Sequence, residues 1–185
     1  MMNKQVYLLF VLLLTTLLTL TSCTIDDVNT SDIPLHTSTK DIHISDFNNK
    51  LILLSFGYTH CPDICPATLM HVAQALDLLT KDERGKVQSI FVTVDPERDT
   101  PIHLSEYVGF FHDEIIGAVV NKDFTRAFRK AFSIESFKTT DVENYEISHT
   151  SYLFVLNEDA KVLDMMGHQT KAESIVQSIR NKLKR

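Results

Sequence analysis

The chain has 185 residues, of which 44% are hydrophobic, enough for one well-buried core and in favour of a single folded domain. Its formal net charge of -6 provides no excess of positive charge for a polyanion, which argues against nucleic acid as a partner. The chain has three cysteines, Cys23, Cys61 and Cys65, and they are the residues that best indicate its chemistry.

The N-terminal segment has the features of an export signal. Residues 6–20 are almost entirely apolar, and Lys4 gives a weakly positive start. The Leu-Thr-Ser-Cys motif at residues 20–23 resembles a bacterial lipobox, which predicts that Cys23 is acylated and becomes the first residue of the mature protein. An uncleaved transmembrane anchor and a soluble secreted protein are the alternatives. The apolar run is short for a spanning helix, which needs about 20 apolar residues.

Three segments are predicted: a signal peptide over residues 1–22, a lipidated flexible tether over 23–45, and a folded domain over 46–185. The tether is predicted because residues 24–45 are polar, rich in Thr, Asp and Ser, and show little periodicity. The protein is then an exported lipoprotein, anchored in a membrane and facing the periplasm or the cell exterior. In that oxidising compartment only Cys61 and Cys65 remain as thiols.

The folded part begins with a strand and a helix. Residues 51–56 form a continuous apolar run before Gly57, which is typical of a strand buried on both faces of a parallel sheet. Helical spacing of apolar residues follows over 67–79, and a proline precedes it at the first turn. Cys65 is therefore predicted at or just before the start of this helix, with Cys61 in the loop before it.

The alternation of strands and helices continues to the C-terminus. Strands are predicted over residues 87–94 and 115–120, helices over 101–111, 123–132 and 171–183, and an antiparallel hairpin over 151–156 and 162–166. Residues 133–147 are ambiguous and are interpreted as a small β-excursion. This order predicts an α/β domain of the thioredoxin-like type, in which helices flank a central mixed β-sheet.

Cys61-Pro-Asp-Ile-Cys65 separates two thiols by three residues. Such a pair can bind one soft metal ion or close into a disulfide. A disulfide across so short a loop removes little chain entropy, so a purely structural disulfide is a poor explanation. Copper binding and thiol redox chemistry remain as alternatives. Because amide groups at a helix N-terminus stabilise anions, we expect a lowered pKa chiefly for the Cys65 thiol, with Cys61 as the second candidate.

Three stretches of the sequence resemble the Sco/SenC family. They are Phe-Gly-Tyr-Thr-His-Cys-Pro-Asp-Ile-Cys-Pro at 56–66, Thr-Val-Asp-Pro-Glu-Arg-Asp-Thr-Pro at 93–101, and Ser-His-Thr at 148–150. The resemblance runs from about Phe47 to the C-terminal helix. Proteins of this family have a thioredoxin-like fold, bind copper through two cysteines and a histidine, and assist assembly of the copper centre of cytochrome c oxidase.

Carried over residue by residue, the resemblance implies that Cys61, Cys65 and His149 bind one copper ion, as Cu(I) or Cu(II). It is compatible with a Cys61–Cys65 disulfide when the thiols are oxidised. His149 is expected in the loop that precedes the third core strand and lies against the cysteine loop. His60 is a rival ligand beside Cys61, but we expect it to face solvent because adjacent side chains diverge.

Asp95 ends the second predicted strand, where the ends of parallel strands gather around the cysteine loop. Its carboxylate could orient a ligand from the second coordination shell or contact a partner. The structural alternative is a turn or capping role, since residues 95–101 are dense in turn-forming residues. Thr100 before Pro101 is predicted to cap the next helix.

The leading hypothesis is a membrane-tethered copper chaperone, and not an enzyme with turnover. Its partner would be the copper-bearing subunit of cytochrome c oxidase or another copper protein. The alternative is a thiol-disulfide oxidoreductase or redox sensor that uses Cys61 and Cys65. His149 discriminates between the two, because tight copper binding needs it and dithiol exchange does not. A peroxidase of the peroxiredoxin type is disfavoured, since the threonine spacing expected before its cysteine is absent.

Overall fold

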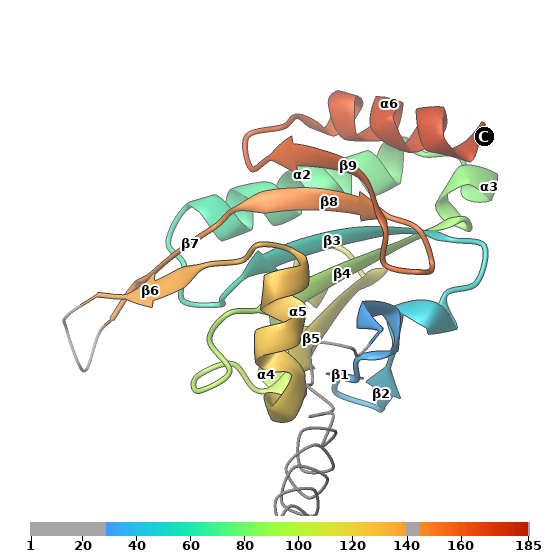
Figure 1. Ribbon diagram of the computed structural model, residues 1–185. Helices are drawn as coiled ribbons and strands as arrows, with labels where there is room; N and C mark the ends of the chain where they lie inside the picture. The colour runs from blue at the N-terminus through green and yellow to red at the C-terminus, as the bar shows by residue number, and fades with distance from the viewer. Residues whose placement is uncertain (1–28, 140–144, 185) are drawn as a thin grey trace, which may run out of the picture.

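The computed structural model describes residues 29–139 and 145–184 (Figure 1). The predicted signal peptide and Cys23 lie outside the described residues. The strands are β1 (Leu35–His36), β2 (Asp41–Ile42), β3 (Leu51–Gly57), β4 (Val87–Thr93), β5 (Ile115–Val120), β6 (Ser136–Lys138), β7 (Ile147–His149), β8 (Tyr152–Leu156) and β9 (Val162–Gly167). The helices are α2 (Ile64–Leu78), α3 (Lys81–Arg84), α4 (Pro101–Gly109), α5 (Thr125–Ala131) and α6 (Ala172–Leu183), with 3-10 turns η2 (Thr30–Asp32), η3 (Ile44–Asp46) and η4 (Lys122–Phe124).

Within residues 29–139 and 145–184, no helix is both long and apolar enough to cross a membrane.

The central sheet is mixed and has the strand order β2-β1-β5-β4-β3-β8-β9. Strands β3, β4 and β5 are parallel, whereas β1, β8 and β9 run antiparallel to their neighbours. Every residue of β3 is buried, which confirms the prediction of a strand covered on both faces. The predicted arrangement of a mixed sheet flanked by helices is therefore present.

Helices pack on both faces of the sheet, and each face has its own contacts with them. Gly57 at the end of β3 faces α2 and lies against the ring of Phe91, which contacts Tyr107 of α4 at a centroid distance of 6.0 Å. Helix α6 packs beside α2 (Figure 1). On the opposite face, α5 packs Phe128 against Phe56 of β3, with the ring centroids 6.0 Å apart. The alternation of Phe56 and Gly57 thus directs α5 to one face and the cysteine-bearing helix to the other.

The folded domain begins earlier than predicted. Residues 29–46 form η2, β1, β2 and η3, and β1 pairs with β5. Four apolar side chains of this stretch are at most 4% exposed: Ile33, Leu35, Ile42 and Ile44. The predicted flexible tether is therefore wrong for residues 29–45, because these side chains belong to the core, and the predicted domain start at 46 is too late. Residues 23–28 lie outside the described residues.

Strands β6 and β7 form a separate two-stranded antiparallel sheet before β8. This is the small β-excursion predicted from the ambiguous stretch. His149 is the last residue of β7 and pairs with Ser136, so it belongs to a strand and not to the predicted loop. Backbone pairing holds the histidine more firmly than a free loop would, because the ladder fixes its φ and ψ angles.

Candidate metal and thiol site

The two cysteines lie where β3 gives way to α2. Cys65 is the second residue of α2 and is buried, whereas Cys61 lies in the preceding loop and is partly exposed; both are free thiols. The Cys65 backbone N–H donates a hydrogen bond to Cys61 Sγ at 3.4 Å. The predicted placement of the pair is confirmed. The sulfur that faces the open end of the helix is that of Cys61.

The pKa values of the two thiols move in opposite directions. The Cys65 thiol donates to Cys61 Sγ, backbone N–H groups of residues 63–65 add to this, and together they lower the pKa of Cys61 to about 5 although burial opposes the shift. The same hydrogen bond, together with burial, raises the pKa of Cys65. The prediction of a lowered pKa is therefore wrong for Cys65, and the lowered pKa belongs to the second candidate, Cys61. Cys65 lies inside the first helical turn, and Cys61 occupies the position in front of the free amides.

His149 approaches the buried cysteine from β7. Its Nε2 atom lies 3.9 Å from Cys65 Sγ, and its Nδ1 atom lies 2.9 Å from the carbonyl oxygen of Thr150. Since a carbonyl oxygen can only accept, Nδ1 carries the proton and Nε2 presents a lone pair towards the sulfur. Burial lowers the pKa of His149, which favours the neutral imidazole that a metal ion requires.

Tyr58 fixes the position of the histidine strand. Its hydroxyl oxygen accepts a hydrogen bond of 3.2 Å from the Ile147 backbone N–H, and its ring lies edge-on to the His149 imidazole at 6.2 Å between centroids. Tyr58 itself is buried and follows directly after β3. The end of β3 therefore orients both the cysteine loop and the strand that carries the imidazole.

Asp99 anchors the cysteine loop, and the sequence analysis did not single it out. It is 1% exposed and accepts hydrogen bonds from the Thr59 backbone N–H at 3.1 Å, from Thr59 Oγ1 at 2.6 Å and from Thr93 Oγ1 at 2.7 Å. Thr59 precedes Cys61 by two residues, and Thr93 ends β4. The only sequence signal for this role was the position of Asp99 inside the second motif.

Asp95 lies beside the site and contacts none of its sulfur or imidazole atoms through a described hydrogen bond. It accepts hydrogen bonds from Arg98 Nε and from the Tyr145 hydroxyl, the latter at 2.8 Å. The Arg98 guanidinium stacks 3.7 Å above the centre of the Tyr145 ring. Asp95 thus holds the segment that leads into β7. Its role in the second coordination shell stays a prediction, while Thr100 caps α4 as predicted by accepting from the His103 backbone N–H.

The chemical types of the three donors suit copper, but Cys61 Sγ is not yet positioned with the other two. Thiolate and imidazole suit copper ions, and the Nε2 lone pair already points at Cys65. One ion held by a sulfur and a nitrogen places them about 3.7 Å apart for metal distances near 2.3 and 2.0 Å, against 3.9 Å here. In the described part of the chain, no three Cys, His, Asp or Glu side chains are close enough to hold a metal as they stand. Cys61 Sγ must therefore turn from the helix amides towards the other two donors.

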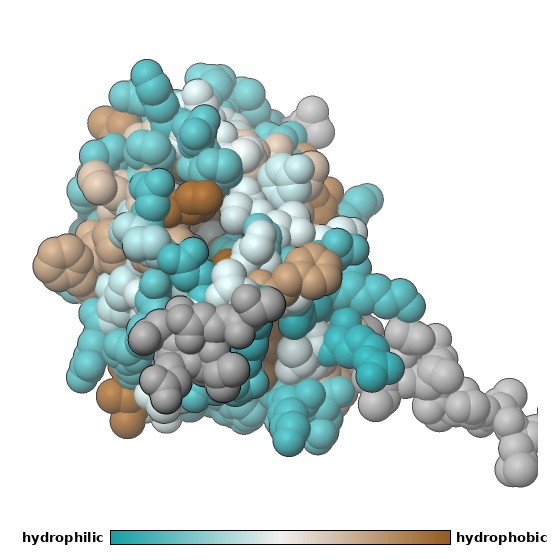
Figure 2. All heavy atoms as spheres, turned by 90° about the vertical axis from the view of Figure 1, so that its left-hand side faces the viewer, coloured by the Kyte–Doolittle hydropathy of each residue, from teal (hydrophilic) through white to brown (hydrophobic). Residues whose placement is uncertain are grey.

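Exposed apolar side chains flank the site without merging. Ile64, next to Cys65, is 38% exposed, and Phe137 on β6 is 67% exposed. Figure 2 shows the end of the molecule where β6 and β7 lie, and its brown apolar areas are separated by teal hydrophilic ones. A protein that docks here meets a mixed surface with separate apolar contact points, as in transient complexes.

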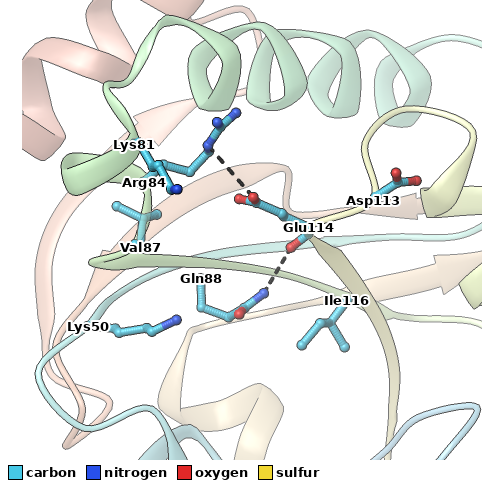
Figure 3. Close-up of a pocket in the computed structure, with 9 residues that line it drawn as sticks. Lys50, Lys81, Arg84, Val87, Gln88, Asp113, Glu114 and Ile116 are labelled. Atoms are coloured by element: carbon cyan, nitrogen blue, oxygen red, sulfur yellow. Dashed lines mark hydrogen bonds and ion pairs between the residues drawn. The ribbon is translucent and has the colours of Figure 1, made fainter.

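A pocket of about 560 Å³ lies away from the cysteines (Figure 3). It is formed near the starts of β4 and β5, whereas the cysteine loop follows the end of β3 in the same parallel sheet. Its charges compensate each other in part, since Arg84 Nε lies 3.7 Å from Glu114 Oε1. Among the described residues that line it there is neither cysteine nor histidine. The pocket is therefore separate from the thiol chemistry.

Replacing Gly57 with alanine is expected to destabilise the fold by about 2 kcal/mol. The new Cβ would lie 2.7 Å from the Phe91 ring and 2.8 Å from Cys65 Sγ, so both side chains must move. Urea unfolding monitored by circular dichroism measures the loss. Gly109→Ala is the matched control, because a Cβ at Gly109 meets nothing within 4 Å. Equal stability of the two variants would contradict the close packing at Gly57.

Two thiols at the start of the helix that follows the central strand, faced by an imidazole from a later strand, define a thioredoxin-like domain with a combined cysteine and histidine site. The SCO1/SenC family model matches residues 35–184. The chain therefore belongs to the SCO1/SenC family, as the motifs predicted.

Known proteins agree with this assignment. The mouse protein SCO2 homolog, mitochondrial, is 36% identical over 141 residues, covering 74% of this chain and 54% of that protein, so the chain spans about half the length of this curated relative. The solution structure of apo Sco1 from Thermus thermophilus is 31% identical, with a TM-score of 0.74 and coverage of 84% of this chain and 92% of that one. The crystal structure of Arabidopsis thaliana ScoI with copper bound is 25% identical, with a TM-score of 0.75 and coverage of 85% and 99%.

Proposed function

We propose that this protein binds one copper ion through Cys61, Cys65 and His149 and delivers it during assembly of a copper protein. The single observation that carries the proposal is the unprotonated Nε2 of His149, 3.9 Å from Cys65 Sγ. The hydrogen bond from Nδ1 to the Thr150 carbonyl keeps that lone pair available. The Arabidopsis relative with copper bound supports copper as the cargo.

Each ligand contributes differently to copper binding. Cys61 supplies a preformed thiolate, since its pKa is lowered to about 5. Cys65 keeps its proton until the metal arrives, because its pKa is raised, so copper binding releases that proton to solvent. His149 supplies a neutral imidazole. Two soft sulfurs suit Cu(I), and the added nitrogen allows Cu(II) to be held as well.

The proposed recipient is the copper-bearing subunit of cytochrome c oxidase, or another copper protein. The partly exposed Cys61 offers the recipient a sulfur that it can reach. Acylation of Cys23 would hold the domain at the membrane on the periplasmic or exterior side, close to such a recipient. The protein then acts by ligand exchange and not by catalytic turnover.

Copper titration of wild type beside His149→Ala tests the proposal. We expect the reduced full chain in detergent to bind one equivalent of Cu(I) tightly, and the variant to bind at least about tenfold more weakly, because one of three ligands is lost. A competing Cu(I) chelator measures the affinity. His36→Ala serves as control, since His36 lies on β1, near the far edge of the sheet. Unchanged affinity in His149→Ala would rule out the three-ligand site.

A second candidate function is thiol-disulfide exchange, and the split in pKa between the two thiols favours it. A partly exposed thiolate at Cys61 can attack a disulfide, and the buried Cys65 can resolve the mixed disulfide. This chemistry does not need His149. Dithiol exchange that survives in His149→Ala, together with weak copper binding in wild type, would make it the primary function.

A further inference from the structure

Two histidines form an exposed pair beside the cysteine loop. His60 immediately precedes Cys61, and its side chain is 47% exposed, as expected from the sequence. His103 lies in the first turn of α4 and is also exposed. Their imidazole rings are 6.1 Å apart between centroids and nearly perpendicular, at 83°. Nothing in the sequence connects the two histidines, because 43 positions separate them.

The buried Asp99 sets the tautomer of His60 through Thr59. Thr59 Oγ1 donates its hydrogen to Asp99 Oδ1 at 2.6 Å, so the same oxygen can only accept from His60 Nδ1, which lies 3.1 Å away. Asp99 Oδ1 also lies 3.9 Å from His60 Nδ1. The proton of the ring is therefore on Nδ1, and Nε2 carries the free lone pair. Carboxylates orient metal-binding histidines in this way, directly or through another group.

The distance between the rings is within the range that one shared metal ion allows. With metal to nitrogen bonds of about 2.0 Å, two imidazoles on one ion have centroids at most about 6.3 Å apart. The observed 6.1 Å lies inside this limit. Both side chains are exposed, so they can rotate to bring one nitrogen of each ring onto the same ion. Two imidazoles with water in the remaining positions suit a divalent ion of borderline softness, and Cu(II) is bound most strongly among the first-row ions.

We propose that His60 and His103 form a second metal site that binds Cu(II) next to the cysteine pair. The site uses nitrogen donors and water alone, so it holds the ion more weakly than thiolates would. Its neighbour in sequence, Cys61, is partly exposed. His60 and Cys61 are adjacent in the chain, with Cα atoms about 3.8 Å apart, so an ion held by His60 lies next to the cysteine loop.

Because this pair lies beside the cysteine loop, we assign it a role in loading copper into the cysteine site. This role rests on the proposed function. Cu(II) bound to the two imidazoles would pass to Cys61, Cys65 and His149 by ligand exchange. The bonds to the imidazoles of His60 and His103 and to the bound water break, bonds to the two sulfurs and to His149 Nε2 form, the Cys65 proton goes to solvent, and copper keeps its oxidation state. Binding at His60 and His103 is independent of this step and can be tested without it.

The first experiment measures binding where the cysteine site cannot contribute. The full chain carrying Cys23→Ser, Cys61→Ser, Cys65→Ser and His149→Ala is titrated in detergent with Cu(II) supplied as its glycine complex. We expect one Cu(II) per chain, with two nitrogen ligands in the electron paramagnetic resonance spectrum. Adding His103→Ala should weaken binding at least about tenfold, and adding His36→Ala should change nothing. Equal affinity with and without His103 would overturn the proposal.

The second experiment measures loading in the chain with its cysteines and His149 intact. We expect His103→Ala to slow the growth of the thiolate-to-Cu(II) absorption band in a stopped-flow instrument, while its final intensity stays that of wild type. If His103→Ala does not change the rate at which the band grows, the histidine pair has no role in loading. Whether the pair binds Cu(II) is then decided by the first experiment alone. A band that never develops in wild type would count against the proposed function, whereas nitrogen-bound Cu(II) in the cysteine-free chain would still support the histidine pair.

Discussion

Alkylation of Cys61 by iodoacetamide is expected to reach half its maximum rate near pH 5 in the reduced, metal-free protein. An unperturbed cysteine does so near pH 8.5. The lowered pKa means that the thiolate persists to lower pH, so the rate stays on its plateau until pH falls through about 5. The measurement is the pH profile of the rate in a Cys23→Ser chain. Buried Cys65, whose pKa is raised, should not react before unfolding.

Two controls identify the cause of the shift. Cys65→Ala removes the hydrogen bond that contributes most to the thiolate of Cys61, so the midpoint of the profile should move to higher pH. Unfolding in urea should return it to about 8.5. The absolute rate is a weaker readout, because the nucleophilicity of a thiolate falls with its pKa. A midpoint near 8.5 in the folded protein would show that the helix amides and Cys65 do not stabilise the Cys61 thiolate.

Asp99→Ala is expected to lower the free energy of unfolding by about 3 kcal/mol. The substitution leaves the Thr59 backbone N–H and the hydroxyls of Thr59 and Thr93 without their acceptor in a buried place. Chemical denaturation measures the loss. Because Thr59 leads into the cysteine loop, the variant should also bind copper more weakly than wild type in the same titration.

Two further variants serve as controls for the loss of stability in Asp99→Ala. Asp99→Asn keeps one acceptor oxygen and should lose less stability than Asp99→Ala. Asp113→Ala changes an exposed aspartate in another turn and should stay within about 0.5 kcal/mol of wild type. If Asp99→Ala were as stable as Asp113→Ala, the hydrogen bonds to Thr59 and Thr93 would contribute little to the fold.

Features that depend on local pattern were predictable from the sequence. The apolar run at 51–56 became the fully buried β3, and the strand expected over residues 115–120 matches β5 residue for residue. The start of α2 next to Cys65 followed from the proline and the spacing after it. In each case a period of two or 3.6, or a capping residue, lies within a few positions of the element it defines.

Features that depend on distant partners were missed. Strands β1 and β2 have two residues each, too few to show a period, and they exist because they pair with each other and β1 with β5. Asp99 gains its role from Thr59, forty positions away in the chain. The acidified thiol was assigned to Cys65 because the sequence places both cysteines near a helix start, and only the fold shows which sulfur faces the amides.

The unequal depth of the two sulfurs gives copper transfer a direction, if the chain acts as proposed. Cys65 Sγ lies beneath the first turn of α2 and against Gly57, where an incoming donor has no room. Cys61 Sγ lies nearer the surface. A recipient thiolate would therefore displace Cys61 first, while Cys65 and His149 still hold the ion. The metal would pass through an intermediate shared by both proteins, and it would never be free in solution.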